Sequence, residues 1–151
     1  MRRIFTPTYM FAKFDDVTPE FLAEKGIRAL LIDIDNTLAP YEEPDPNERV
    51  LAWFDLLKQN GIKASLVSNN HADRVERFNA PLGLPAYPDS KKPGKKTLLL
   101  AIEKMGVDKS ECVLYHIFCR INDGVATKLE RISVSDVVGN GDMTEVLRRL
   151  D

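Results

Sequence analysis

Two aspartates, one residue apart, follow an aliphatic segment in the string LLIDIDNTLAP. A carboxylate is costly to bury unless it is paired with a charge or bound to a metal, so Asp33 and Asp35 require polar partners. Candidate partners stand in two later segments. Ser68 and Asn69 follow a second apolar segment, and Lys92 precedes a helical pattern. Carboxylates, a hydroxyl and an ammonium group together are suited to bind a cation and a phosphate.

Helical and extended patterns alternate along the chain, and they are expected to bring these polar groups together. We expect helices over residues 19–25, 47–59, 71–79, 97–105 and 143–150, and strands over residues 27–34, 62–67, 112–118 and 132–134, with a loop over residues 85–93. The order predicts an α/β fold, a doubly wound and mostly parallel sheet with helices on both faces. Ligands of such sheets bind at the carboxyl ends of the strands, where all the polar clusters fall.

Apolar spacing supports two of these helices. Val50, Trp53, Phe54 and Leu57 fall at positions i, i+3, i+4 and i+7, which places them on one helical face. Leu98, Ile102 and Met105 share a face of the later helix in the same way. Both faces are expected to pack on the sheet.

Composition limits the classes of protein to consider. The 151 residues include 44% hydrophobic and 29% charged residues, which fits one domain over residues 1–151 with an arm and short helix over 1–25. The formal net charge of -2 does not favour nucleic acid or an anionic membrane as a partner. Cys112 and Cys119 match no usual zinc spacing, which favours reduced core residues and a cytoplasmic location. The start has no secretory signal pattern, and no segment is long enough to span a bilayer.

The motifs resemble those of the haloacid dehalogenase (HAD) superfamily of phosphatases. The first motif of that superfamily, D-x-D-x-T at the end of the first strand, is matched by Asp33, Asp35 and Thr37. The string DIDNTL, the SNN after the second strand and the K-P before a helix are similar to the YqeG family of HAD subfamily IIIA. The resemblance runs over about residues 26–114. It implies a HAD-like, Rossmannoid fold and phosphomonoester hydrolysis through a phosphoaspartate.

The resemblance and the chemistry of phosphoryl transfer together assign roles. Asp33 is expected to be the nucleophile, and Asp35 the general acid and base. Lys92 is expected to offset the developing charge. Ser68 and the backbone N–H of Asn69 are expected to bind phosphate oxygens.

The same resemblance adds a metal and one further residue of the first motif. A magnesium ion is expected to be held by the side chain of Asp33 and the backbone carbonyl of Asp35. Thr37 is placed among the substrate-binding residues by its position in the motif.

Each site residue also has a purely structural interpretation. An aspartate after a strand is often a turn former, and Ser68 is suited to cap the next helix. Lys91, Lys95 and Lys96 surround Lys92, and the choice of Lys92 follows the family pattern. A calcium-binding loop that begins at Asp33 is excluded. Its sixth position requires Gly and its twelfth Glu, whereas this chain has Leu38 and Pro44 there. His71 and His116 are expected to be structural, since neither has a partner at a useful spacing.

The family pattern breaks after the fourth strand. Aligned without gaps, Tyr115 and Arg120 stand where the fourth motif has the acids that complete magnesium coordination. Three explanations are open: Asp123, or less favourably Asp136, replaces the missing ligand; the protein is an impaired phosphatase that keeps phosphate or scaffold binding; or residues 115–131 differ from the natural segment, as after a compensated reading-frame change.

Spacing also bears on the substrate. The intervals between Asp35 and Ser68 and between Ser68 and Lys92 hold no cap domain, and capless HAD relatives act on large or surface-presented phosphoesters. A lipid phosphate is a candidate, as in relatives that act on phosphatidylglycerophosphate, and phosphoprotein and nucleotide substrates stay open. The basic and aromatic start could contact a membrane surface, although a packed arm is favoured. A receiver-type signalling domain is disfavoured, because its phosphate acceptor follows the third strand.

Overall fold

The structure, a computed structural model, describes residues 9, 11–92, 94–118 and 128–133, and gives only the backbone of 113–118 and 128–133. The elements in chain order are η1 Phe14–Asp16, α1 Pro19–Glu24, β1 Ala29–Ile32, α2 Glu48–Gln59, β2 Lys63–Val67, α3 Ala72–Asn79, β3 Ala86–Tyr87, α4 Lys95–Met105, η2 Lys109–Glu111, β4 Cys112–Phe118 and β5 Lys128–Ser133.

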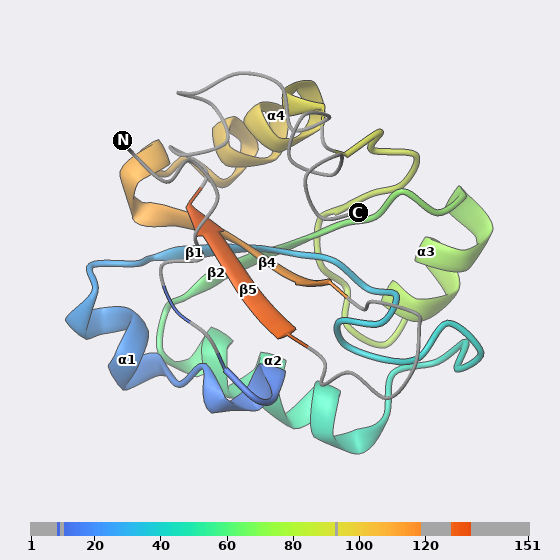
Figure 1. The fold of residues 1–151 in the computed structure, drawn as a ribbon, viewed down its shortest axis with the longest axis horizontal. Helices are drawn as coiled ribbons and strands as arrows, with labels where there is room; N and C mark the ends of the chain where they lie inside the picture. The colour runs from blue at the N-terminus through green and yellow to red at the C-terminus, as the bar shows by residue number, and fades with distance from the viewer. Residues whose placement is uncertain (1–8, 10, 93, 119–127, 134–151) are drawn as a thin grey trace.

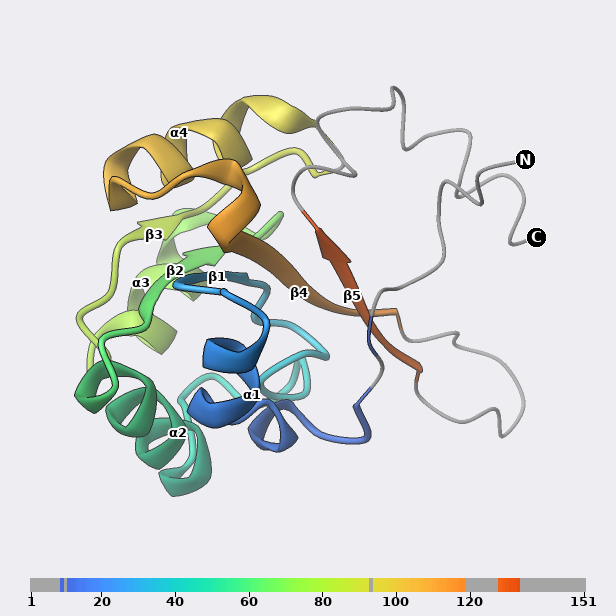
Figure 2. The same cartoon turned by 90° about the vertical axis from the view of Figure 1, so that its left-hand side faces the viewer.

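One five-stranded sheet organises the described chain (Figure 1), and its strand order, β3-β2-β1-β4-β5, can be followed in Figure 2. The first four strands are parallel, and β5 pairs antiparallel with β4. The central strand β1 consists of four aliphatic residues, all buried, as expected of a parallel strand covered on both faces. The predicted fold class, a mostly parallel doubly wound sheet, is confirmed.

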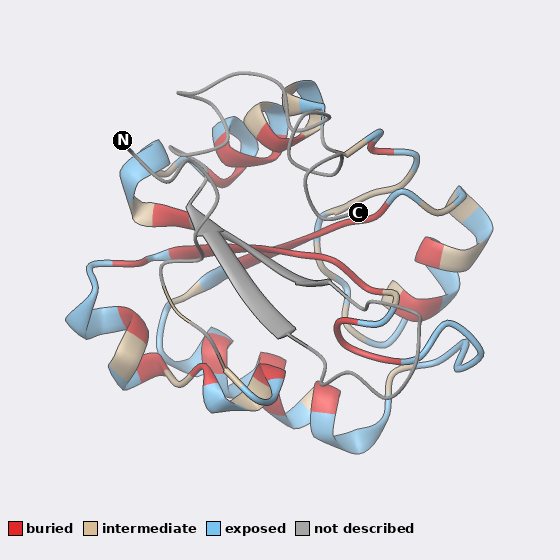
Figure 3. Ribbon diagram, viewed as in Figure 1, coloured by how far each residue is buried: buried red, intermediate tan, exposed pale blue. Residues whose placement is uncertain are grey.

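Helices cover both faces of this sheet (Figure 2). Alternate residues of β1 face opposite sides, so that Leu30 and Ile32 join the core beneath α2 and α3, whereas Ala29 and Leu31 join the core beneath α4. Figure 3 shows the buried residues running along the central strands and the inner sides of the helices. The two cores therefore cover both faces of β1.

The predicted apolar helix faces are confirmed. Val50, Trp53, Phe54 and Leu57 of α2 are all buried, as are Leu98, Ile102 and Met105 of α4. Asn47 accepts a hydrogen bond from the Val50 N–H (3.1 Å) and caps the start of α2. Gly106 ends α4 in the left-handed conformation (φ 63°), which suits glycine.

The structure differs from the sequence-based elements at the ends of the chain and in one loop. The expected loop over residues 85–93 contains the two-residue strand β3. The last expected strand, over residues 132–134, is found as β5, which begins four residues earlier and is antiparallel. The expected helix over residues 143–150 lies outside the described residues.

The aromatic residues of the N-terminal arm that the structure describes are packed. The rings of Tyr9 and Phe11 contact the ring of Phe21 edge to face, with centroids 4.9 and 5.0 Å away. This agrees with a packed arm rather than a membrane contact at these two residues. No helix in the described part of the chain has the length and apolar character needed to cross a membrane.

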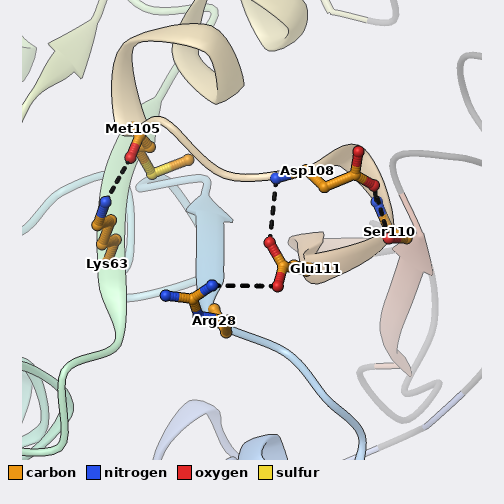
Figure 4. A network of polar contacts seen from close by, with 6 residues as sticks. All are labelled: Arg28, Lys63, Met105, Asp108, Ser110 and Glu111. Atoms are coloured by element: carbon orange, nitrogen blue, oxygen red, sulfur yellow. Dashed lines mark hydrogen bonds and ion pairs between the residues drawn. The ribbon is translucent and has the colours of Figure 1, made fainter.

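Polar contacts hold the amino edge of the sheet, where β1, β2 and β4 begin (Figure 4). Arg28 precedes β1 and forms an ion pair with Glu111 (3.2 Å), whose other carboxylate oxygen accepts the Asp108 N–H. Lys63, the first residue of β2, donates from Nζ to the carbonyl of Met105 at the end of α4 (2.6 Å). These contacts link the starts of the strands at the amino edge of the sheet. The loops that follow β1, β2 and β3 lie at the opposite, carboxyl edge.

The connection from β1 to β2 and the connection from β2 to Lys92 are both short. One loop and α2 join β1 to β2, and α3 with β3 lies between β2 and Lys92. Within the described residues neither connection contains an inserted cap domain. In the part of the chain that the structure describes, the carboxyl edge of the sheet is therefore covered by loops.

Candidate active site

The loops that follow β1, β2 and β3 meet at the carboxyl edge of the sheet, because these strands are parallel neighbours. A cleft of about 340 Å³ lies there, and its described lining residues are Asp33, Asp35, Tyr41, Ser68, Asn69 and Asn70. The acidic pair and the polar residues after β2, which are far apart in the sequence, thus share one cleft.

A tight turn after β1 presents the acidic pair. The N–H groups of Thr37 and Leu38 donate to the carbonyl of Ile34, and Asn36 adopts a positive φ of 56°. Asparagine tolerates this left-handed conformation better than most residues. The turn returns the chain so that Asp35 forms an isolated bridge with Ala39, and both carboxylates remain at the cleft.

Lys92 forms an ion pair with Asp33, with Nζ 2.7 Å from Oδ1. The two side chains are only 8% and 10% exposed, respectively. Lys91 and Lys96, in contrast, are exposed to solvent. Of the lysines around position 92, the structure therefore places Lys92 against the acidic pair.

Burial and charge act in opposite directions on Lys92. Removal from water lowers the pKa of its ammonium group below the usual value of 10.5, and the attraction of Asp33 and, more weakly, Asp35 opposes this shift. The ion pair with Asp33 holds the ammonium group beside that carboxylate.

The side chain of Asn69 holds the segment that carries Lys92. Its Oδ1 accepts the backbone N–H of Lys92 (2.6 Å) and the hydroxyl of Ser90 (2.8 Å), while its Nδ2 donates to the carbonyl of Lys92 (2.9 Å). A single amide thus satisfies both backbone groups of Lys92. Sequence analysis assigned only the backbone N–H of Asn69 to the site, so this use of the side chain is an addition.

The turn that carries Lys92 is compact. Lys91 has a positive φ of 54°, and the Gly94 N–H donates to the Lys91 carbonyl at 2.7 Å. A Cβ atom at Gly94 would lie 2.8 Å from that carbonyl oxygen, closer than real Cβ contacts. Glycine at this position therefore permits the turn that directs Lys92 towards Asp33.

Ser68 serves the turn before α3 and also lines the cleft. Its side-chain oxygen accepts the Asn70 N–H (3.0 Å), and its backbone bonds to Tyr87 and Ser90 connect β2 to the segment after β3. The prediction that Ser68 caps the next helix is wrong, because the N-cap residue of α3 is His71 and the Ser68 hydroxyl accepts an N–H that lies before the helix. Ser68 is instead a turn former that also lines the cleft. Its binding of phosphate stays a prediction.

Asp35 has two side-chain partners that sequence analysis missed. Arg74 forms an ion pair with Oδ1 (3.0 Å), and Asn70 donates from Nδ2 to Oδ2 (3.1 Å). Arg74 lies four residues beyond Asn70, on the first turn of α3. The sequence signal was weak, since an arginine on a charged helix usually faces solvent.

The remaining predicted site residues are not among the described residues that line the cleft. Thr37 is 4% exposed in the turn after β1 and is not among the described residues that line the cleft, so its role in substrate binding stays a prediction. Asp123, Asp136 and Arg120 lie outside the described residues. The backbone of Tyr115 pairs with Ile32, the residue before Asp33.

Tyr41 is a lining residue that the motifs did not predict. It follows Pro40 in the proline-rich loop after β1, and it is 60% exposed. An exposed aromatic side chain at the rim of a polar cleft can contact the part of a ligand that extends out of the cleft. A proline-rich loop next to the acidic motif was the only sequence signal for it.

The donors at the cleft suit a hard cation. Asp33 and Asp35 supply carboxylate oxygens, and Ser68, Asn69 and Asn70 supply hydroxyl and amide groups, the oxygen chemistry that Mg²⁺ prefers. Magnesium commonly uses one or two carboxylates and completes its shell with water and substrate phosphate. Among the described residues no group of three or more His, Cys, Asp or Glu side chains could hold a metal, so the present set fits such a shared site rather than a closed protein site.

The charges of the cleft are balanced in a way that favours phosphate once a cation is added. Two carboxylates, Asp33 and Asp35, face two cations, Lys92 and Arg74. A divalent ion would make this group of charges net positive, which attracts the dianion of a phosphomonoester. The arrangement can bring an anionic nucleophile and an anionic substrate together.

Comparison with known proteins shows the family of this chain. A family model described as "haloacid dehalogenase-like hydrolase" matches residues 8–115, which include every described residue of the cleft. The curated protein "Probable phosphatase YqeG" from Bacillus subtilis (strain 168) is 34% identical over 114 residues, which are 76% of this chain and 66% of the relative. The chain thus matches somewhat less than two thirds of that relative's length.

A solved structure shares the fold over most of the chain. The crystal structure of a hypothetical protein from Xanthomonas campestris superposes with a TM-score of 0.55 and 14% identity, and covers 93% of this chain and 98% of that chain. At this identity the likeness concerns the fold alone.

Proposed function

The chain belongs to the haloacid dehalogenase-like hydrolase family, and from this premise we propose that it is a magnesium-dependent phosphomonoester phosphatase that acts through a phosphoaspartate at Asp33. The resemblance of the motifs to that family is confirmed by the matching family model and by the 34% identical relative. The observation that carries the proposal is that Asp33 and Asp35 line one cleft at the carboxyl edge of the sheet, with Lys92 paired to Asp33.

In this mechanism the carboxylate of Asp33 attacks the phosphorus atom, and the bond to the alcohol oxygen breaks. Asp35 gives a proton to the departing alcohol and later removes a proton from the water that hydrolyses the aspartyl phosphate. Lys92 contacts Asp33 directly, so its charge is positioned to attract the equatorial phosphate oxygens. Ser68 and the backbone N–H of Asn69 are proposed to bind the same oxygens.

Magnesium would be held by Asp33 and Asp35, with Asp123 proposed as a further ligand. When bound, it supplies positive charge that reduces the repulsion between the carboxylate and the phosphate. We propose a cytoplasmic location, where the two cysteines would stay reduced.

The open cleft supports a large substrate. Loops alone cover the carboxyl edge in the described chain, and Tyr41 is exposed at the rim. A phosphomonoester on a lipid or a macromolecule can reach such a cleft, because no cap domain among the described residues restricts the size of the leaving group. Comparison of phosphate release from a vesicle-borne phosphomonoester and from a short-chain analogue tests whether the cleft accepts a large substrate.

Removal of the metal tests the proposed function. Treatment with EDTA is expected to reduce hydrolysis of p-nitrophenyl phosphate by at least about 100-fold, because the charge stabilisation of the metal is lost. Mg²⁺ should restore activity, whereas Ca²⁺ should restore it poorly, because Ca²⁺ prefers more ligands at longer distances. Activity that persists unchanged in EDTA would contradict magnesium dependence. Absence of turnover with retained binding of beryllium fluoride would instead identify a phosphate-binding relative.

The contacts of Asn69 give a second prediction. Asn69→Ala removes the amide that holds both backbone groups of Lys92, so we expect kcat/KM to fall by about 10- to 100-fold through misplacement of the ammonium group. Steady-state kinetics with p-nitrophenyl phosphate measures the effect.

Asn60→Ala is the matched control for this change, because Asn60 makes its side-chain bond to Leu56 within α2, away from the cleft. Equal kinetics in Asn69→Ala and Asn60→Ala would show that the amide of Asn69 does not position Lys92 for catalysis.

A further inference from the structure

The two carboxylates of the cleft have separate cationic partners. Asp33 is paired with Lys92, which follows β3, whereas Asp35 is paired with Arg74 on α3. The Asp35 and Arg74 side chains are 18% and 13% exposed, so this ion pair is largely shielded from solvent. A shielded pair with hydrogen-bonding geometry is stronger and more specific than a surface pair.

Both oxygens of Asp35 are held by the start of α3. Arg74 Nη2 lies 3.0 Å from Oδ1, and Asn70 Nδ2 lies 3.1 Å from Oδ2. Two donors on two different oxygens fix the rotation of the carboxylate as well as its position. Free rotation of this group would otherwise reduce the fraction of molecules with Asp35 directed correctly.

Arg74 is itself held in place. Its Nη1 donates to the Pro44 carbonyl (2.8 Å), and its guanidinium group lies 5.3 Å from the centre of the Phe78 ring. The planar guanidinium can bond a carbonyl and a carboxylate through two nitrogens at once, which a lysine cannot reproduce. Arg74 therefore connects a fixed helix, the loop after β1 and the Asp35 carboxylate.

We propose that Arg74 is a positioning residue that, with Asn70, fixes the orientation of the Asp35 carboxyl group, whose protonated form gives its proton to the leaving alcohol and is left as the carboxylate. This inference rests on the proposed function, in which Asp35 is the general acid and base. Arg74 contacts Asp35 and acts through it.

A neighbouring arginine provides a matched control. Arg77 also lies on α3 and also holds the loop after β1, through two hydrogen bonds to Asp45 (3.0 and 2.9 Å). Among the described residues, the hydrogen bonds of the Arg77 side chain go to Asp45 and not to Asp35. Arg77→Met thus loosens the same loop without removing a contact to Asp35.

The test compares leaving groups. p-Nitrophenolate leaves readily without a proton, whereas an alkyl alcohol requires one. In the phosphorylation step, which kcat/KM reports, only the alkyl substrate therefore depends strongly on Asp35. For Arg74→Met we expect kcat/KM for an alkyl phosphate such as glycerol phosphate to fall by about 100-fold, and that for p-nitrophenyl phosphate by less than about fivefold. Arg74→Lys should recover part of the loss, and Arg77→Met should leave the ratio of the two substrates unchanged.

The possible results separate this inference from the proposed function. An equal loss for both substrates in Arg74→Met, or the same change of ratio in Arg77→Met, would overturn the positioning role. If the wild-type chain hydrolyses neither substrate, the proposed function fails, and the position of Asp35 is then read in crystal structures. A carboxylate that leaves Asn70 in Arg74→Met supports the positioning role, and one that keeps its orientation overturns it.

Discussion

Asp33→Asn is expected to reduce the kcat for phosphomonoester hydrolysis by on the order of 10⁴-fold or more, the largest effect of any single change in this chain. The amide of asparagine is nearly the same size as the carboxylate but cannot attack phosphorus to form the acyl phosphate. Asp33 is almost fully enclosed at the carboxyl end of β1, so water does not readily replace it as nucleophile. Steady-state kinetics with p-nitrophenyl phosphate and Mg²⁺ measures the loss.

Asp55→Asn is the control for this change, because Asp55 is exposed on α2 and does not line the cleft. It is expected to keep wild-type kinetics. Circular dichroism should show that Asp33→Asn remains folded, although the variant leaves Lys92 without the charge of its closest partner. Wild-type turnover in folded Asp33→Asn would exclude a phosphoaspartate at this residue.

Lys92→Met is expected to reduce kcat/KM by about 10²- to 10³-fold, because it removes the cation beside Asp33 without changing the length of the side chain greatly. A preorganised charge in a shielded cleft stabilises the transition state more than an exposed charge does. Steady-state kinetics with p-nitrophenyl phosphate tests this change.

Lys91→Met is a strict control, since Lys91 is the preceding residue and is exposed to solvent. Its positive φ of 54° is equally unfavourable for lysine and methionine, so the substitution adds little backbone strain. Equal losses in the two variants would assign the effect to the loop rather than to the ammonium group of Lys92.

Much of the fold could be predicted because local signals were strong. The apolar face of α2 and the aliphatic segment of β1 are each produced by burial, which leaves a periodic pattern in the sequence. β3 was missed because its two residues carry no periodicity, and it exists through pairing with β2. The antiparallel direction of β5 depends on the path of the chain, which local patterns do not encode.

The convergence of the site could be predicted for a topological reason. In a parallel sheet the residues that follow neighbouring strands lie at one edge, so Asp33, Asp35 and Ser68 were expected to meet. The ion pair of Lys92 with Asp33 agrees with the same reasoning. The roles of these residues in catalysis remain the proposals given above.

The partners of Asp35 could not be predicted in this way. Arg74 stands on a helix rich in charge, and its inward direction depends on a carbonyl of the proline-rich loop and on the ring of Phe78. The side chain of Asn69 likewise acts on a segment 23 residues away in the sequence. Such contacts arise from tertiary packing, which leaves no local signature.

The most direct test of the account is detection of the phosphorylated enzyme. Wild-type protein is mixed with substrate and Mg²⁺, quenched in acid and digested, and the peptide that contains Asp33 is examined by mass spectrometry. A phosphoaspartate mechanism predicts one additional phosphoryl group at Asp33, which is absent from Asp33→Asn and from protein quenched without substrate. Rapid substrate turnover with the phosphoryl group on another residue, or with no phosphorylated peptide under conditions that preserve acyl phosphates, would contradict the central claim.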